Sequence, residues 1–211
     1  CFPGQGSQYP GMLKLLVEQS PAARQALDEV EAILDRYGYQ SFSDLAWGDS
    51  AAMGKQVWPT QLAMLIANWV MFRTVQSVGI VPDAVLGHSF GEYSALAASG
   101  AIDIETAIAL TRARCDGIAA ARVQGGLLAA GGSAQRVAEL AQQAGLAIHV
   151  ANFNTPDQTV VGGAPEDLAR FESLLKGAGI GAKLLAVPAP FHTPLMAPAG
   201  KPLERALAEA Q

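Results

Sequence analysis

Apolar residues in the first third of the chain recur at helical spacing. Ser20-Pro21 is a pair suited to the N-cap and the first position of a helix, and apolar side chains then follow every three or four residues. A second stretch, 60–78, is apolar on most faces, which indicates a helix buried in a core. We also expect an apolar helix over 10–18. The apolar positions after Ser20-Pro21 are Ala23, Leu27, Val30, Ile33 and Leu34.

The middle of the chain alternates between short apolar runs and helical patterns. Residues 83–87 read as a strand, and we expect helices over 89–99 and from Asp103 to Arg122. Alternation of strand and helix is typical of a parallel sheet covered by helices on both faces. The pattern therefore predicts an α/β protein with a parallel sheet.

The pattern changes after Gly125 and predicts a smaller body. Its order of elements is β-α-β-β-α-β, which is ferredoxin-like. We expect this small subdomain over 124–188, inserted into a large subdomain formed by 1–123 and 189–211. The large subdomain is expected to be truncated at both ends, because the chain opens without room for a first strand and closes within a helical stretch. The expected strands are 127–130, 147–153, 158–161 and 182–187, and the expected helices are 134–143 and 165–176.

Composition narrows the classes of function. Of the 211 residues, 50% are hydrophobic and 16% are charged, as in a well-packed globular protein. The net charge of -5 and the lack of a dense Lys/Arg run argue against nucleic acid as a partner. The two cysteines, Cys1 and Cys115, are too few for a disulfide framework or a metal site. We find no secretory signal, and the apolar stretch 62–72 is too short for a membrane span, so we expect a cytoplasmic protein.

The chain carries one pattern typical of a catalytic nucleophile. Gly87-His88-Ser89-Phe90-Gly91 follows a short apolar run and precedes residues that favour a helix. A strand that turns through two glycines into a helix exposes the central serine, and the helix N-terminus supplies N–H groups for an oxyanion. Ser89 is therefore the candidate nucleophile, although the bare pattern also occurs by chance.

Three histidines could serve as the partner of Ser89. His149 lies in an alternating strand pattern and is expected on a strand face. His88 is better placed to brace the turn than to accept the serine proton. His192 lies in a proline-stiffened loop, 188–195, which would suit a general base. From sequence alone a loop or core histidine remains an equal reading of His192.

Several blocks in order resemble one known family. They are FPGQGSQ at 2–8, Gly87–Glu92, Asn152 with Pro156 and Gln158, and Phe191-His192 with Leu195-Met196. This series resembles the malonyl-CoA:acyl carrier protein transacylase family, which includes acyltransferase domains of fatty acid and polyketide synthases. The resemblance runs over nearly the whole chain. It implies a large subdomain resembling an α/β-hydrolase and a ferredoxin-like small subdomain.

The resemblance also implies a mechanism. Ser89 would attack the thioester carbonyl of an acyl-CoA while His192 accepts its proton, and the acyl ester would pass to the phosphopantetheine thiol of an acyl carrier protein. The backbone N–H groups of Gln5 and Phe90 match the oxyanion-hole positions of the family. No cofactor is bound in this scheme, since CoA and phosphopantetheine belong to the donor and the acceptor.

Four further residues are candidates for substrate binding, three of them through the resemblance to the family. Arg114 matches the arginine that pairs with the carboxylate of a malonyl group, whereas Arg112 is expected on a solvated helix face. Phe191 resembles the form that prefers malonyl over branched units, although Ala189-Pro190 before it departs from the usual pattern. Gln61 matches a pocket glutamine and could equally be a helix-start residue, and the remaining substrate-binding candidate is His88.

Two alternatives remain open at this point. An acyl hydrolase or thioesterase of the same fold would also carry Gly-x-Ser-x-Gly, and it would resolve the acyl-serine with water. A non-catalytic fragment that docks a carrier protein is the second alternative. Ser89, His192 and Arg114 together favour transfer of a dicarboxylic acyl group.

Overall fold

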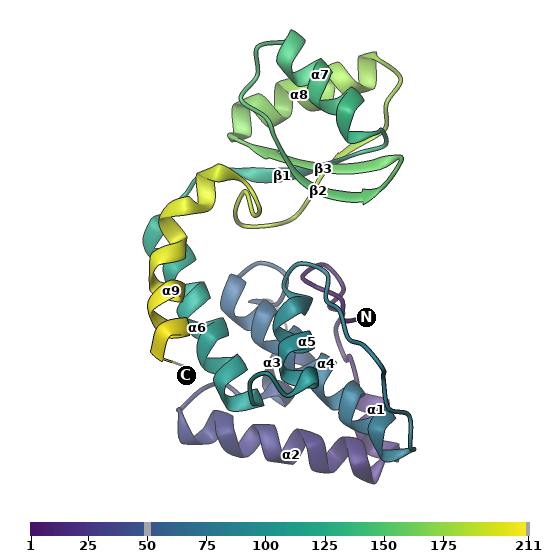
Figure 1. Ribbon diagram of the computed structural model, residues 1–211, viewed down its shortest axis with the longest axis vertical. Helices are drawn as coiled ribbons and strands as arrows, with labels where there is room; N and C mark the ends of the chain where they lie inside the picture. Colours follow the sequence, from purple (N-terminus) through teal and green to yellow (C-terminus); the bar gives the residue numbers. More distant parts are fainter. Residues whose placement is uncertain (49–51, 210–211) are drawn as a thin grey trace. The chain divides into compact units, whose positions relative to one another are not determined.

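The computed structural model describes residues 1–48 and 52–209 (Figure 1). The chain divides into two compact units, Cys1–Cys115 with Arg205–Gln211 and Asp116–Glu204, which we call the helical unit and the sheet unit. The subdomain limits expected at 123/124 and 188/189 do not coincide with these limits and stay a prediction. Each unit is described by itself below.

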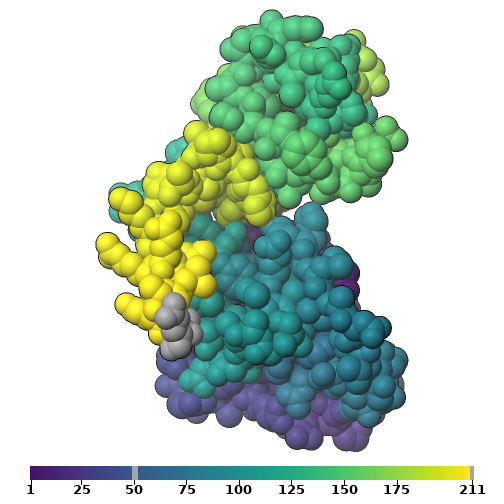
Figure 2. Space-filling model, viewed as in Figure 1, coloured from purple at the N-terminus to yellow at the C-terminus, as the bar shows by residue number. Residues whose placement is uncertain are grey.

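The helical unit is built around one long buried helix, α4. This helix spans Val57–Ser77, and all its residues from Pro59 to Asn68 are buried, as expected for a stretch that is apolar on most faces. Most of the unit is drawn in purple to teal in Figure 2. The other helices of the unit are α1 (Lys14–Gln19), α2 (Pro21–Arg36), α3 (Phe42–Trp47), α5 (Gly91–Ser99) and the first part of α6 (Ile104–Ala121).

Local signals account for the start of α2. The Ser20 hydroxyl accepts a hydrogen bond from the backbone N–H of Ala23 at 3.3 Å, and Pro21 occupies the first turn. The five apolar residues predicted to share a face are all buried. Helix α1 begins at Lys14 rather than at residue 10, because Gly11 and Leu13 adopt positive φ and interrupt the helix. The short α3 was not predicted.

Of the predicted parallel sheet, the described residues of the helical unit contain a single parallel β-bridge. Phe2 donates to the carbonyl of Leu86 at 2.8 Å and accepts from the N–H of His88 at 2.9 Å, which makes a parallel bridge between Phe2 and Gly87. No strand forms among the described residues of this unit. The expectation of a strand over 83–87 within a parallel sheet is therefore corrected, because one rung between two short segments is too little to form a sheet.

A buried amide ties the N-terminal segment to two helices. Asn68, on α4, donates from Nδ2 to the carbonyl of Pro3 at 3.1 Å and to the hydroxyl of Ser94 at 3.0 Å. Asn68 and Ser94 are both buried, so these bonds satisfy groups that would be costly to leave unpaired. The contact fixes the segment before Gly4 against α4 and α5.

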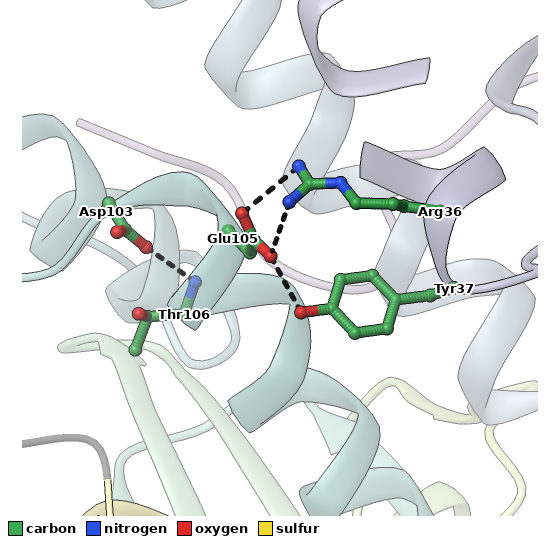
Figure 3. Close-up of polar contacts among 5 residues, drawn as sticks. All are labelled: Arg36, Tyr37, Asp103, Glu105 and Thr106. Carbon is green, nitrogen blue, oxygen red and sulfur yellow. Dashed lines mark hydrogen bonds and ion pairs between the residues drawn. The ribbon is translucent and has the colours of Figure 1, made fainter. Parts of the chain in front are cut away.

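A surface cluster joins the end of α2 to the start of α6 (Figure 3). Arg36 contacts both carboxylate oxygens of Glu105 at 3.3 Å, and the Tyr37 hydroxyl donates to the same carboxylate at 2.7 Å. This acceptor and its negative charge raise the pKa of Tyr37. Asp103 accepts from the N–H of Thr106 at 2.6 Å, which lowers the pKa of Asp103 and confirms the predicted N-terminus of α6.

The sheet unit contains a four-stranded antiparallel sheet in the order β2-β3-β1-β4. Helix α7 has the predicted limits, and the strands differ from prediction by a few residues at their ends. The predicted order β-α-β-β-α-β is confirmed. The elements are the end of α6, β1 (Gly126–Ala130), α7 (Ala134–Gln143), β2 (His149–Thr155), β3 (Gln158–Gly163), α8 (Pro165–Gly177), β4 (Ala182–Leu184), the 3-10 helix η2 (Pro194–Ala199) and the first half of α9 (Gly200–Glu209).

One face of this sheet is covered by α7 and α8 (Figure 1). Both helices place buried apolar side chains in the same cluster as the central strands β1 and β3, which explains the helical spacing seen in the sequence. Fully buried members of the cluster are Leu128, Val137, Val161, Leu168, Phe171 and Leu175. Among the described residues of the whole chain, no helix is long and apolar enough to cross a membrane.

Replacing Asn68 tests the tie between the N-terminal segment and the helices. We expect Asn68→Ala to lower the free energy of unfolding by about 2 kcal/mol, because the buried Ser94 hydroxyl loses a partner. Gln76→Ala, at an exposed position of the same helix, serves as the control and should change it by less than about 0.5 kcal/mol. Urea denaturation of both variants measures the difference, and equal effects would contradict the account.

Candidate active site

Ser89 lies at a sharp turn with a strained backbone. Its φ is 54°, in the left-handed region that non-glycine residues rarely adopt, and α5 begins two residues later at Gly91. A side chain at Gly87 would collide with the backbone of Gly91 and Glu92, and one at Gly91 would collide with the backbone of Phe2. Both glycines of Gly-x-Ser-x-Gly are therefore required by close backbone contacts, as in a nucleophile elbow.

Backbone hydrogen bonds hold this turn in place. The N–H of His88 donates to Phe2, and the carbonyl of His88 accepts from Gly91, both at 2.9 Å. The carbonyl of Ser89 accepts from Glu92 at 3.1 Å. These bonds offset a local strain of about 1–3 kcal/mol and agree with the expectation that His88 braces the turn. The His88 side chain itself is exposed.

A second glycine turn packs directly on the elbow. A Cβ at Gly4 would lie 2.5 Å from the His88 carbonyl oxygen and 3.3 Å from the backbone nitrogen of Phe90. The absence of a side chain at Gly4 thus lets residues 4–6 approach the residue after Ser89. Among the described residues, neither the N–H of Gln5 nor that of Phe90 finds an acceptor within the chain. Two such N–H groups on one turn and at one helix N-terminus suit an oxyanion.

Arg114 lies next to the elbow through Phe90. Its Cζ is 5.8 Å from the centroid of the Phe90 ring, which is buried and stacks on Tyr93 at 5.2 Å. Burial lowers the pKa of Arg114 and raises that of Tyr93, where the positive charge of Arg114 acts in the opposite direction. A guanidinium stays charged even so, and this arrangement therefore places a largely buried cation beside the residue that follows Ser89.

The structure distinguishes Arg114 from Arg112. Arg112 stacks on the ring of Trp58, with 5.0 Å between its Cζ and the ring centroid, and it is half-buried. The expectation that Arg112 lies on a solvated helix face is corrected, because α6 packs this position against an aromatic side chain. Sequence spacing could not separate the two arginines, since the partner rings lie far away along the chain.

Gln61 is buried and contacts the glycine turn. Helix α4 begins at Val57, so Gln61 lies in its second turn and is not a helix-start residue. Its Nε2 donates to the side-chain Oε1 of Gln5 at 3.2 Å, and its Oε1 accepts from the thiol of Cys115 at 3.4 Å. The sequence did not single out Cys115 or Tyr93 as site residues. The signals available were that Cys115 directly follows Arg114 and that Tyr93 lies in the helix after the elbow.

In the sheet unit, His192 lies in a rigid loop. Its φ is 60° and its side chain is exposed. The Thr193 hydroxyl donates to the carbonyl of Pro190 at 2.6 Å, and the N–H of Phe191 donates to Ala189 at 2.9 Å. These bonds agree with the predicted stiffness of the loop. His149 lies on β2, as expected.

The loop is seated on the ends of two strands. A Cβ at Gly162 would lie 2.6 Å from a methyl carbon of Thr193, and one at Gly125 would lie 2.8 Å from the ring of Pro190. The side chain of Phe191 is buried. Ser89 belongs to the helical unit and His192 to the sheet unit, so their pairing stays a prediction. In residues 1–48 and 52–209, no group of three or more His, Cys, Asp or Glu side chains could hold a metal ion.

Comparison with known proteins establishes the family. The profile of the acyl transferase domain family matches residues 1–211. The chain belongs to this family, and the resemblance noted in the sequence is confirmed.

Three relatives of this chain that are transacylases illustrate the similarity. The chain is 34% identical to the malonyl CoA-acyl carrier protein transacylase of Bacillus subtilis, over 98% of this chain and 66% of that protein. The structure of the corresponding transacylase of Coxiella burnetii has a TM-score of 0.90 at 32% identity and covers 100% of this chain and 67% of that one. A malonyl-transacylase solved in complex with a type II polyketide synthase acyl carrier protein has a TM-score of 0.87 at 35% identity, covering 100% and 69%. The chain thus spans about two thirds of the length of these relatives.

Gly4 provides a test of the contact between the two turns. We expect Gly4→Ala to slow labelling of Ser89 by a fluorophosphonate probe at least tenfold, because a Cβ would push the Gln5 N–H away from the elbow, and a lost oxyanion donor typically costs about 100- to 1000-fold. Gly177→Ala is the control, since a Cβ there meets nothing within 4 Å. Equal labelling rates in the two variants would contradict this role of the turn.

Proposed function

We propose that this protein transfers a malonyl or related dicarboxylic acyl group from CoA to the phosphopantetheine thiol of an acyl carrier protein. The observation that carries the proposal is the largely buried cation of Arg114, held through Phe90 beside the strained Ser89. A nucleophile alone would fit any acyl transfer. A largely buried guanidinium packed on the neighbouring Phe90 ring favours an acyl group that carries its own carboxylate.

In the first half-reaction Ser89 is acylated. Its Oγ attacks the thioester carbonyl carbon, and His192 accepts the hydroxyl proton. The backbone N–H groups of Gln5 and Phe90 stabilise the oxyanion that forms. The carbon–sulfur bond then breaks, and CoA leaves as a thiol with the proton held by His192. No bound cofactor takes part, because the thioester already carries the activated acyl group.

In the second half-reaction the carrier protein resolves the ester. The phosphopantetheine thiol gives its proton to His192 and attacks the ester carbonyl of acyl-Ser89. The carbon–oxygen bond breaks, and Ser89 recovers a proton from His192. Support for a carrier protein as partner comes from the relatives, since one of them was solved with its acyl carrier protein.

The remaining substrate-binding residues complete this proposal. Gln61 and His88 are assigned to substrate binding on the helical unit, and Phe191 is assigned the role of limiting the room for a branch at the α-carbon. We further propose that the helical unit corresponds to an α/β-hydrolase-like large subdomain and the sheet unit to a ferredoxin-like small subdomain. The strand order β2-β3-β1-β4 and the high TM-scores support this. The cytoplasmic location stays a prediction.

Mass spectrometry of the intact protein after incubation with malonyl-CoA tests the proposal. We expect a malonyl adduct on the wild type and none on Ser89→Ala. Arg114→Ala should lower the rate of malonyl loading about 10- to 100-fold and leave acetyl loading close to that of the wild type, because only malonyl has a carboxylate to pair.

Arg112→Ala serves as the matched control, since it removes an arginine from the same helix that stacks on Trp58 instead. Its loading with malonyl and acetyl should match the wild type. Absence of an adduct on the wild type would contradict the proposal. Rapid release of malonate without any carrier thiol would favour an acyl hydrolase instead.

A further inference from the structure

The side chains of Cys115, Gln61 and Gln5 are joined in a line of two hydrogen bonds that ends at the glycine turn 4–6. The thiol of Cys115 on α6 donates to Oε1 of Gln61 at 3.4 Å, and Nε2 of Gln61 donates to Oε1 of Gln5 at 3.2 Å. Cys115 is 5% exposed and Gln61 is 1% exposed. The line therefore runs from the buried side of α6, through α4, to the turn that carries the Gln5 backbone.

The chemistry of the three groups gives this line a direction. A thiol donates one hydrogen bond and accepts only weakly, so it favours the oxygen of the Gln61 amide over its nitrogen. With the oxygen held toward Cys115, the nitrogen faces Gln5 as a donor. If the amide were reversed, Oε1 of Gln61 would face Oε1 of Gln5 in a part-buried setting, which is unfavourable.

The end of the line is the residue proposed to stabilise the oxyanion. Gln5 lies between Gly4 and Gly6, and Gly6 has a φ of 111°, so the turn has little side-chain packing of its own to hold it. Its side chain is anchored by Gln61, and a fixed side chain restricts the backbone N–H of the same residue. Oxyanion stabilisation depends on donors that are in position before the reaction.

We propose that Cys115 is a positioning residue, which sets the amide of Gln61 and through it the Gln5 turn of the oxyanion hole. This rests on the proposed function of Gln5 in acyl transfer. Cys115 touches neither the substrate nor the reacting atoms in this role. Its thiol acts as a hydrogen-bond donor, not as a nucleophile.

Substitutions at Cys115 separate the hydrogen bond from packing. In the intact protein, Cys115→Ala and Cys115→Val both remove the donor, and the valine fills the space. We expect each to lower the rate constant of malonyl-Ser89 formation at saturating malonyl-CoA about five- to tenfold, with little change in the half-saturating concentration. Cys115→Ser keeps a donor and should restore the rate to within about twofold.

A double-mutant cycle tests the route of the effect. Gln5→Ala keeps the backbone N–H and removes the side chain that receives the bond, so it should slow acylation by a similar factor. Adding Cys115→Ala to Gln5→Ala should then cost no further rate, because the line is already broken. Urea denaturation of each variant shows whether the loss of rate follows a loss of stability.

The outcomes distinguish this inference from the function on which it rests. If the wild-type protein forms no malonyl adduct, the proposed function is contradicted, and so is this inference. A wild type that is acylated, beside a Cys115→Ala variant with the same rate, overturns the positioning role alone. A serine variant as slow as the alanine variant, or additive losses in the double variant, also overturns it.

Discussion

The close approach of the Gly4 turn to the elbow at Ser89 is the contact on which the site depends. A side chain at Gly4 would strike the His88 carbonyl, so the two backbones can meet only through a glycine. The same contact places the Gln5 turn beside Phe90, next to Ser89 with its positive φ, and the segment before Gly4 is also bound by Asn68. Strain at Ser89 is therefore offset by hydrogen bonds from residues far apart in the sequence.

Phe90 connects the cation of Arg114 with the nucleophile Ser89. Phe90 follows the nucleophile, offers its N–H at the start of α5, and carries its ring beneath Arg114. A carboxylate drawn to Arg114 would thus hold its acyl carbon close to the residue that precedes Phe90. Burial strengthens this attraction, since a cation with little water around it gains more from an opposite charge. The family relationship and the local geometry both support the proposed chemistry.

Local signals explain which parts were predictable from the sequence. The start of α2 at Ser20-Pro21, the limits of α7 and the order of elements in the sheet unit follow from caps and periodicity. The elbow was also predictable, because Gly87 and Gly91 on either side of Ser89 form a local sequence pattern. The parallel sheet was wrong, because a strand pattern cannot show whether neighbouring strands are present. The contacts of Gln61 with Gln5 and Cys115 join residues 56 and 54 positions apart, and no local pattern could reveal them.

Peptide mapping after brief reaction with malonyl-CoA identifies the side chain that carries the acyl group. Cys1 and Cys115 carry free thiols, which could compete with Ser89 because a thioester exchanges readily with thiols. The position of the acyl group therefore shows which side chain is the nucleophile. If Ser89 is the nucleophile, we expect a malonyl ester on the peptide that contains Ser89 and on no other peptide. A malonyl group on either cysteine in place of Ser89, or no covalent intermediate under conditions of turnover, would contradict it.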